Sequence, residues 1–260
     1  MIVLEAKNVC KQFGGLKAVD NVDLQIREKS IFGIIGPNGA GKSTFFNICT
    51  GYYPPTSGTI SFMGENITGI NPELIAEKGM ARTFQNIKLF DNMSVLENIK
   101  IGYHMHTKTT LADAILNTRR CREDEKMVTK ASLELIDRVG LTKYKDFRAG
   151  NLPYGIQRKL EIARSLAMQP KLLLLDEPAA GMNPQETMQL MEFITQLREE
   201  GLTIVVIEHD MKFVMNMCDE IMVLNYGQKI CQGTPQEVCR DENVIQAYFG
   251  SDLQLESEGG

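Results

Sequence analysis

Apolar and polar positions alternate through the first part of the chain. Val22, Leu24 and Ile26 are apolar, and polar residues separate them. Alternation with a period of two is typical of a strand that buries one face and exposes the other. We therefore predict short, half-buried antiparallel strands over residues 1–32 and another edge strand over residues 57–64.

Three runs further along are almost wholly apolar: Ile31–Ile35, 171–175 and Thr203–Ile207. Uninterrupted Leu, Ile and Val residues are typical of parallel strands that are covered on both faces. A helical pattern follows the second run over residues 184–200, and another begins at Asp210 after the third run. This succession of strands and helices predicts an α/β fold with a parallel sheet.

The middle of the chain, from about residue 93 to residue 167, has mostly helical periodicity. Residues 118–139 combine many charges with apolar positions at helical spacing, which predicts a helix with a solvated face. Before this stretch, Asn71 and Pro72 suit the N-cap and first turn of a short helix, and residues 80–84 predict one more strand.

Composition narrows the possible functions. The 260 residues are 43% hydrophobic and 23% charged, which is ordinary for a globular protein and argues against a disordered or collagen-like chain. The formal net charge of −5 lacks the basic excess of a general DNA or RNA binder, so we predict no nucleic-acid partner. We also expect no transmembrane segment and no signal peptide, because no apolar run approaches ~20 residues and the start has no charged leader.

A glycine-rich loop follows the first apolar run and matches the pattern G-x-x-x-x-G-K-[ST]. It lies between a predicted strand and a predicted helix over residues 42–50, the context that this pattern requires. Glycines let backbone N–H groups turn toward phosphates, and the helix adds the positive end of its dipole. Lys42 supplies a positive charge to the β- and γ-phosphates, Ser43 a hydroxyl to Mg²⁺, and Thr44 reaches a phosphate oxygen. The predicted nucleotide-binding residues are Gly36, Pro37, Asn38, Gly39, Ala40, Gly41, Lys42, Ser43 and Thr44.

Two carboxylates, Asp176 and Glu177, end the second apolar run, and His209 follows the third. Parallel strands bring their carboxyl ends to one edge of the sheet, where ligands of open α/β folds bind. There Asp176 is suited to hold Mg²⁺, Glu177 to accept the proton of an attacking water, and His209 to contact the γ-phosphate or orient that water. The pattern therefore predicts ATP and Mg²⁺ as ligands and ATP hydrolysis as the reaction. Capping of the following helices is the simpler alternative role for these residues.

With these residues in place, nearly the whole chain, about residues 3–249, resembles an ATP-binding subunit of an ABC transporter. Residues 36–43 correspond to its Walker A loop, the strand that ends at Asp176 to Walker B, and residues 179–183 to its D-loop. Arg-Thr-Phe-Gln-Asn, which contains Gln85, corresponds to the Q-loop.

The resemblance assigns roles to individual residues. It makes Gln85 a ligand of Mg²⁺ that also takes part in catalysis, His209 the switch histidine and Lys42 a catalytic as well as a binding residue. It further implies that Phe13 stacks on adenine, a contact worth ~1–3 kcal/mol, with a plain core position as the alternative.

The signature motif departs from the family. The family usually has L-S-G-G-Q at the start of a helix, whereas this chain has Leu-Pro-Tyr-Gly-Ile. Asn183 likewise replaces the usual aspartate of the D-loop. The glycine and the helix N-terminus are retained, so the resemblance still implies that the signature faces the nucleotide of a partner ATPase. Its candidate residues are Leu152, Pro153, Tyr154 and Gly155.

These departures sharpen the resemblance. L-P-Y-G-x-Q-R, E-P-A-A-G-M-N-P and I-E-H-D-M-K-F-V-M resemble the G-type ATPase subunit of branched-chain amino-acid importers. This implies a sister ATPase subunit (or a homo-dimer in isolation), two transmembrane permease subunits and, indirectly, an extracytoplasmic binding protein for Leu, Ile and Val. The chain would then be a peripheral subunit on the cytoplasmic face of the membrane.

The resemblance also implies the architecture: a P-loop NTPase with a RecA-like parallel-sheet core, an N-terminal antiparallel β subdomain and an inserted α-helical subdomain. We assign residues 1–250 to one ABC ATPase domain. About 1–90 and 168–250 form the β subdomain and the core, and about 91–167 form the helical subdomain with the signature. Residues 251–260 are expected to be a flexible tail.

Other interpretations fit the residues less well. A GTPase needs the string N-K-x-D, and the nearest string, at residues 216–219, lacks the lysine. The stretch between Gln85 and Leu152 is too short for the coiled coils of DNA-repair ABC ATPases. An importer of urea or another amide, and an ABC ATPase without a transport role, remain the alternatives. Phe90 and Met93 are candidates to line the groove that meets the membrane subunits, or to pack in the core.

Overall fold

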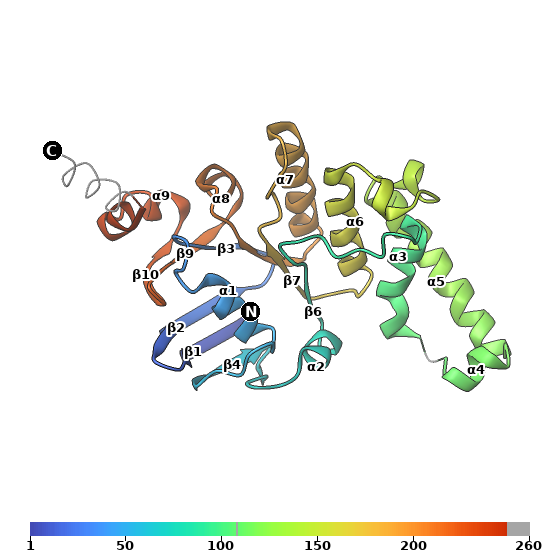
Figure 1. The fold of residues 1–260 in the computed structure, drawn as a ribbon, viewed down its shortest axis with the longest axis horizontal. Helices are drawn as coiled ribbons and strands as arrows, with labels where there is room; N and C mark the ends of the chain where they lie inside the picture. The colour runs from blue at the N-terminus through green and yellow to red at the C-terminus, as the bar shows by residue number, and fades with distance from the viewer. Residues whose placement is uncertain (108, 249–260) are drawn as a thin grey trace.

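The computed structural model describes residues 1–107 and 109–248, which form two β-sheets and a set of helices (Figure 1). The strands are β1 (Ile2–Phe13), β2 (Leu16–Arg27), β3 (Ile31–Ile35), β4 (Ser57–Phe62), β5 (Glu65–Asn66), β6 (Met80–Arg82), β7 (Leu172–Asp176), β8 (Thr203–Ile207), β9 (Glu220–Asn225) and β10 (Gln228–Gly233). The α-helices are α1 (Lys42–Cys49), α2 (Pro72–Glu77), α3 (Val95–Gly102), α4 (Leu111–Ile115), α5 (Arg119–Arg138), α6 (Tyr154–Leu166), α7 (Pro184–Glu199), α8 (Met211–Met217) and α9 (Pro235–Val238).

The larger sheet has six strands in the order β10-β9-β3-β8-β7-β6. Strands β3, β7 and β8 are the three apolar runs; all their residues are buried, and β8 pairs in parallel with both β3 and β7, as predicted. Strands β6 and β9 extend this parallel sheet, and β10 pairs antiparallel with β9. The β9–β10 hairpin was not predicted from the sequence, because β10 is exposed or half-buried along its length and has no regular alternation of apolar and polar residues.

The smaller sheet is antiparallel, in the order β2-β1-β4-β5. The alternation along β2 is confirmed, since Val22, Leu24 and Ile26 are all buried. The expected short strands are wrong in length, however: β1 and β2 have 12 residues each, and their register shifts where bulges absorb irregular positions. Strand β4 is also not an edge strand, because β1 pairs with one side and β5 covers part of the other.

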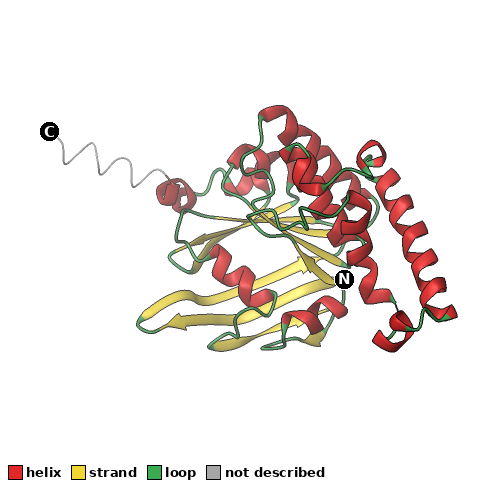
Figure 2. Ribbon diagram, turned by 45° about the vertical axis from the view of Figure 1, so that its right-hand side comes forward, coloured by secondary structure: helices red, strands yellow, loops and turns green. Residues whose placement is uncertain are grey.

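Helix α1 lies between the two sheets (Figure 2). Its Phe45, Phe46 and Ile48 share one hydrophobic core with the antiparallel sheet and with one face of the parallel sheet. This packing fixes the start of α1 next to the end of β3, which is where the glycine loop runs. The arrangement predicted from the sequence, strand then glycine loop then helix, is confirmed.

The other face of the parallel sheet packs against helices. Residues of α3, α5, α6, α7 and α8 form a second core with β3, β7 and β8, and helices α3–α6 gather beyond the β6 edge (Figure 1). The charge-rich stretch is helix α5, which Thr118 caps. The division at residues 90 and 168 remains a prediction, and the expected flexible tail at 251–260 lies outside the described residues.

Strand β6 is shorter than predicted and ends at Arg82 rather than residue 84, because the chain turns away from the sheet into the segment that contains Gln85. A last backbone hydrogen bond, from Thr83 N to Leu174 O, extends 2.9 Å across to β7. In the part of the chain that the structure describes, no helix has the length and apolar character needed to cross a membrane.

Candidate functional site

The glycine loop is held by backbone packing on one side and is open on the other. Gly41 has a φ of 98°, and a Cβ added there would lie 2.4 Å from the carbonyl oxygen of Ala18. Gly39 has a φ of 79°, but an added Cβ would meet nothing within 4 Å. Both positions adopt backbone conformations that favour glycine. A loop fixed at Gly41 and open at Gly39 has the form of a cradle for phosphates.

Lys42 curls back over this loop. Its Nζ donates hydrogen bonds to the carbonyl oxygens of Gly36, at 2.6 Å, and Pro37, at 2.9 Å, and the residue is only 7% exposed. Burial lowers the pKa of the ammonium group, and the nearby carboxylates of Glu177 and Asp176 oppose this shift. The predicted phosphate loop and the predicted acid pair are therefore brought together by the fold. Ser43, next in the chain, is exposed.

Asp176 ends strand β7 and is 7% exposed. Its Oδ2 accepts a hydrogen bond from a guanidinium nitrogen of Arg82 at 2.8 Å, so a buried ion pair lies at the predicted metal ligand. Sequence analysis did not single out Arg82. The only signal for it was a charged residue at the end of a short strand, next to the Q-loop.

Glu177 is the point where the predicted catalytic side chains meet. Its Oε2 accepts a hydrogen bond from Nε2 of Gln85 at 2.8 Å and lies 3.8 Å from Nδ1 of His209. Glu177 has a φ of 45°, in the left-handed region that residues other than glycine seldom adopt. A hydrogen bond from its N–H to the carbonyl oxygen of Ile207, at 2.9 Å, holds this turn against β8. Such local strain is often found at functional sites.

The capping alternative is wrong for these residues. Helix α8 is capped by the side chain of Asp210, which accepts hydrogen bonds from Lys212 N and Phe213 N, and helix α7 is capped by Asn183. His209 is instead 60% exposed by its side chain and faces Glu177. The Asn that replaces the family's D-loop aspartate therefore has a local role, since either side chain can cap a helix.

Glu208 is a buried acid that sequence analysis missed. It is 1% exposed, and its two carboxylate oxygens accept hydrogen bonds from Ala179 N at 3.0 Å and His209 N at 3.2 Å. Burial raises the pKa of this carboxyl group. Glu208 thereby ties the D-loop to the backbone of the switch histidine.

Phe13 lies at the end of β1 and is 43% exposed, so the core alternative for it is wrong. Its ring packs edge-to-face against Tyr53, with 5.5 Å between centroids, and Nζ of Lys11 lies 5.1 Å from its centre. The ring is thus partly accessible at the surface, as a stacking residue requires. Stacking on adenine itself stays a prediction.

The signature segment contacts its own D-loop. Pro153 stands at the N-cap of α6, and the hydroxyl of Tyr154 donates a hydrogen bond to the carbonyl oxygen of Ala180 at 2.9 Å. A Cβ added to Gly155 would lie 3.0 Å from the carboxylate of Glu186. Between described residues, no hydrogen bond or ion pair joins residues 152–155 to the phosphate loop. The structure therefore does not bring the predicted signature to the chain's own nucleotide site.

Helix α6 is hydrogen-bonded to the Q-loop segment through charged side chains whose buried position was not predicted from the sequence. Arg158 is fully buried and donates hydrogen bonds to the carbonyl oxygens of Phe84, at 2.8 Å, and Gln85, at 2.7 Å. It also pairs with Glu161 at 2.8 Å, which in turn accepts a hydrogen bond from Lys88 N at 3.1 Å. Charges at helical spacing usually indicate a solvated face. Here the charged side chains are buried and join the signature helix to the Q-loop segment.

A groove of about 450 Å³ opens beside the Q-loop. Phe84, Phe90, Ile101 and Met105 line it, and Phe90 is 48% exposed, so a core role for Phe90 is wrong. Met93 is half-buried and lines an adjoining groove that shares Ile101 and Met105. An apolar surface next to a motif that contacts the acid pair is suited to dock another protein.

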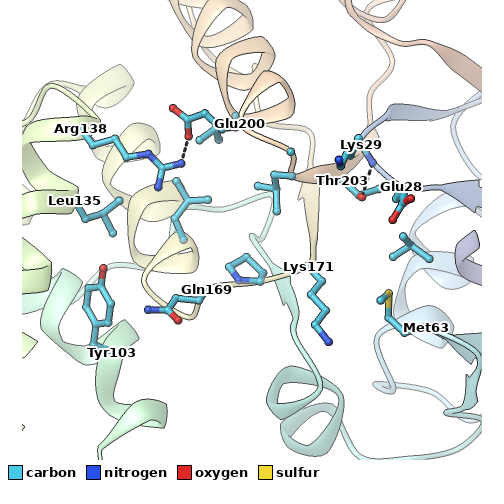
Figure 3. A pocket seen from close by; sticks show the side chains of 16 residues that line it. Glu28, Lys29, Met63, Tyr103, Leu135, Arg138, Gln169, Lys171, Glu200 and Thr203 are labelled. Carbon is cyan, nitrogen blue, oxygen red and sulfur yellow. Dashed lines mark hydrogen bonds and ion pairs between the residues drawn. The ribbon is translucent and has the colours of Figure 1, made fainter. Parts of the chain in front are cut away.

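A cleft of about 510 Å³ lies at the opposite edge of the sheet (Figure 3). Lys171 and Thr203, at the amino ends of β7 and β8, line it together with Tyr103 of the helical region. An ion pair between Arg138 of α5 and Glu200 spans its upper part (Figure 3). None of the predicted site residues lines this cleft, so it takes no part in the site described above.

The residues at the carboxyl edge suit Mg²⁺ bound together with a nucleotide. A hydroxyl (Ser43), a carboxylate (Asp176) and an amide oxygen (Gln85) are the oxygen ligands that this ion prefers, and it commonly takes few protein ligands and several from phosphates and water. The described residues contain no cluster of three or more His, Cys, Asp and Glu that could hold a metal alone. The open loop at Gly39 leaves room for the phosphates.

Comparison with known proteins gives a consistent result. Residues 19–180 match the family model described as ABC transporter, and residues 228–253 match the model described as branched-chain amino acid ATP-binding cassette transporter. The chain is 45% identical to the high-affinity branched-chain amino acid transport ATP-binding protein LivG of Salmonella typhimurium, over 95% of this chain and 98% of that protein. It is 44% identical to BraF of Pseudomonas aeruginosa, a protein of the same description, with the same coverage.

A solved structure shares the fold. It is the ADP conformation of an ATP-binding cassette of an ABC transporter, with a TM-score of 0.84, 32% identity, and coverage of 96% of this chain and 99% of that chain. A nucleotide-free cassette of an ABC transporter aligns with a TM-score of 0.83 at 32% identity and covers 95% of this chain. The predicted α/β architecture with an antiparallel β part and an inserted helical part is confirmed.

Proposed function

Because this chain belongs to the ATP-binding cassette (ABC) transporter family, we propose that it hydrolyses ATP to drive an importer of branched-chain amino acids. The observation that carries the proposal is the convergence of Gln85 and His209 on Glu177, beside the ion pair of Asp176 and close to Lys42. Likeness over 98% of the length of LivG supports the choice of solute, since no residue of an ATPase subunit is expected to touch it.

Nucleotide binding follows from the loop and its surroundings. The exposed ring of Phe13 stacks on the adenine, and backbone N–H groups of residues 38–43 contact the phosphates. Lys42 leaves the carbonyl oxygens of Gly36 and Pro37 and donates to phosphate oxygens instead, because a charge-assisted hydrogen bond to phosphate is stronger than one to a neutral carbonyl. Ser43, Asp176 and Gln85 would hold Mg²⁺, which would neutralise phosphate charge.

Hydrolysis depends on Glu177. Its carboxylate accepts the proton of the attacking water, as a general base does. The left-handed turn at Glu177 and the hydrogen bond from Gln85 aim the carboxylate, and His209 on the neighbouring loop is near enough to orient the water or contact the γ-phosphate. Glu208 supports this arrangement because it binds the backbone N–H of His209.

The site is completed by other chains. The signature of a sister ATPase covers the γ-phosphate, and residues 152–155 of this chain do the same for the sister's nucleotide. One of the two permease subunits docks in the groove at Phe90, next to the Q-loop. Arg158 and Glu161 join this groove to the signature helix, so docking, signature and Gln85 move as one unit. The chain would thus be a peripheral subunit on the cytoplasmic face of the membrane.

One experiment tests the proposal as a whole. The chain is co-expressed with the permeases and the sister ATPase of its own operon, reconstituted in vesicles with the matching binding protein, and ATP-dependent uptake of radiolabelled leucine is measured. Uptake should require ATP inside the compartment that contains the ATPase, should fail with Glu177→Gln, and should be competed by isoleucine and valine. Competition by urea or amides but not by valine would reject the solute, and ATP hydrolysis without any uptake would reject transport.

A further inference from the structure

Arg82 lies in an unusual position for a charged residue. It ends strand β6, its side chain is 11% exposed, and its guanidinium group lies within 4.7 to 5.3 Å of the ring centres of Phe46, Phe84 and Tyr52. A planar guanidinium group can stack on aromatic faces while its edge donates hydrogen bonds. The aromatic cage therefore fixes the plane in which the guanidinium nitrogens lie.

The edge of that plane reaches three oxygens. One terminal nitrogen donates to Oδ1 of Asn47 at 2.6 Å and to Oγ1 of Thr50 at 3.1 Å, and the other donates to Oδ2 of Asp176 at 2.8 Å. Asn47 and Thr50 belong to helix α1 and its C-cap, so Arg82 joins that helix to the end of strand β7. A lysine could not make this set of contacts, because it offers a single point charge.

Asp176 is consequently held by one oxygen only. Its Oδ2 is bound to Arg82, whereas Oδ1 accepts no hydrogen bond from any described residue, although the residue is only 7% exposed. A buried ion pair seldom adds stability over apolar packing of the same volume. The pair is therefore better explained by what it does to the geometry of Asp176 than by a contribution to folding.

We propose that Arg82 is a positioning residue for the Mg²⁺ site: it locks Oδ2 of Asp176 and leaves Oδ1 as the oxygen that serves the bound ion or its water. This inference rests on the proposed function, since it assumes that Asp176 serves Mg²⁺ bound with ATP. Hydrogen-bond partners of metal ligands fix the ligands' orientation, and their loss typically lowers metal affinity about 10- to 100-fold. The proposal gives Arg82 no direct contact with the metal or the nucleotide.

The test measures the contribution of Mg²⁺ to ATP binding, without relying on hydrolysis. A fluorescent ATP analogue is titrated into the full chain once with excess Mg²⁺ and once with EDTA, and the ratio of the two dissociation constants is the readout. Arg82→Met fills the aromatic cage without a charge. It should reduce this ratio about ten-fold while the affinity in EDTA changes less than about two-fold.

Two further variants make the result specific. Arg82→Lys retains the positive charge but loses the guanidinium group that bonds several oxygens at once, so the ratio of the two dissociation constants should fall as well. If Arg82→Met does not fold, Arg82→Lys serves as the test variant. Arg138→Met removes an ion pair at the opposite edge of the sheet and should leave the ratio unchanged. Thermal unfolding of each variant shows whether the protein measured is folded.

The outcomes separate the two claims. An unchanged ratio in folded Arg82→Met or, where that variant does not fold, in Arg82→Lys, overturns the positioning role. So does a loss of affinity that is equal in Mg²⁺ and in EDTA, because Arg82 would then only support the fold. If the wild-type chain itself shows no ATP binding in Mg²⁺, the proposed function fails, and the inference fails with it.

Discussion

The phosphate loop and the signature segment are both glycine-containing starts of helices, yet the chain builds them differently. In the loop before α1, all the donors come from consecutive residues, and Lys42 adds the charge within the same turn. In the segment before α6, Pro153 has no N–H, and the hydroxyl of Tyr154 is bound to the chain's own Ala180. We therefore expect the first helix N-terminus to bind phosphate within the single chain, and the second to contact a nucleotide only when a partner subunit brings one.

This difference indicates how nucleotide binding and contact with a partner are divided between the core and the helical region. In the proposed function, the core side supplies the groups that bind ATP and accept the proton of water, and the helical side supplies the signature that contacts the sister subunit's nucleotide. The clamp is linked back to the core by Arg158, whose guanidinium group contacts the Q-loop backbone. Mutations in the core should therefore change ATP binding by a single subunit, whereas mutations in the signature should change ATP-dependent behaviour only in the assembled complex.

The largest expected effect is at Glu177. Glu177→Gln keeps the size of the side chain and an oxygen that can accept the hydrogen bond from Gln85, but it cannot accept a proton. ATP turnover of the assembled complex should fall by ~10²-fold or more, and ATP affinity should stay within a few-fold. Phosphate release and equilibrium binding are measured on the same preparation. Glu199→Gln, an exposed acid at the end of α7, is the matched control; near-normal turnover in Glu177→Gln would show that another group is the base.

Lys42 comes next. Lys42→Ala removes a charge-assisted hydrogen bond to phosphate, worth ~1.5–3 kcal/mol, so ATP affinity of the single chain should fall about 10- to 100-fold. Binding of a fluorescent ATP analogue checks this, with Lys143→Ala in the helical region as the control. If the affinity of Lys42→Ala matched that of the control, the loop would not be the phosphate site.

A pair of glycine substitutions tests the comparison directly. Gly41→Ala places a Cβ 2.4 Å from the backbone oxygen of Ala18 at a φ of 98°, and such strain costs ~1–3 kcal/mol, which should appear as a roughly 5- to 100-fold loss of ATP affinity or as instability. Gly155→Ala requires no positive φ and adds its Cβ inside a helix that alanine favours, where the nearest atom is Oε1 of Glu186 at 3.0 Å rather than backbone.

The single chain with Gly155→Ala should therefore bind ATP within about two-fold of the wild type and unfold at a similar temperature, whereas the assembled complex should lose ATPase activity. Isothermal titration and thermal unfolding are measured for both variants. If Gly41→Ala and Gly155→Ala lowered the ATP affinity of the single chain equally, the claim that only the start of α1 binds ATP in the single chain would be wrong.

Features that lie within short motifs could be predicted from the sequence, whereas contacts between distant segments could not. The three buried parallel strands, the loop and the group formed by Gln85, Glu177 and His209 were all predictable, because short motifs and strand order place them at one edge of the sheet. The strands, the phosphate loop and the acid pair each lie in a short run of consecutive residues, and Gln85 was identified through the family's Q-loop string, so little tertiary information was needed.

The charged residues inside the molecule were not predictable in this way. Arg82, Arg158, Glu161 and Glu208 look like surface residues in the sequence, and their partners lie in distant segments. A local pattern cannot tell a solvated charge from one that is paired in the interior, because the difference depends on which segments the fold brings together. The same limit applies to Tyr154, whose hydroxyl partner is in the D-loop.

The smallest effects are expected in the signature itself. Tyr154→Phe removes the hydrogen bond from the hydroxyl to Ala180, at 2.9 Å, and a longer one that the hydroxyl accepts from the guanidinium group of Arg158, at 3.5 Å. Stability should therefore fall by ~0.5–3 kcal/mol, while ATP-dependent closure of the two ATPases changes little. Pro153→Ser supplies the hydroxyl that other family members have. A hydrogen bond to a charged phosphate is worth more than a neutral one, so closure around the sister's ATP should tighten about ten-fold.

Closure is followed by crosslinking or fluorescence energy transfer between the two ATPase subunits, over a range of ATP concentrations. The two variants separate two accounts of the lost serine. If the site facing Pro153 is simply the weaker clamp, Pro153→Ser lowers the ATP concentration needed for closure, and Tyr154→Phe leaves it in place. If instead Tyr154→Phe abolishes closure without a change in unfolding temperature, the phenol leaves Ala180 on assembly and replaces the missing hydroxyl. The signature would then bind the sister's γ-phosphate with a full set of donors, as the phosphate loop does. The contrast between the two helix N-termini would hold only for the isolated chain.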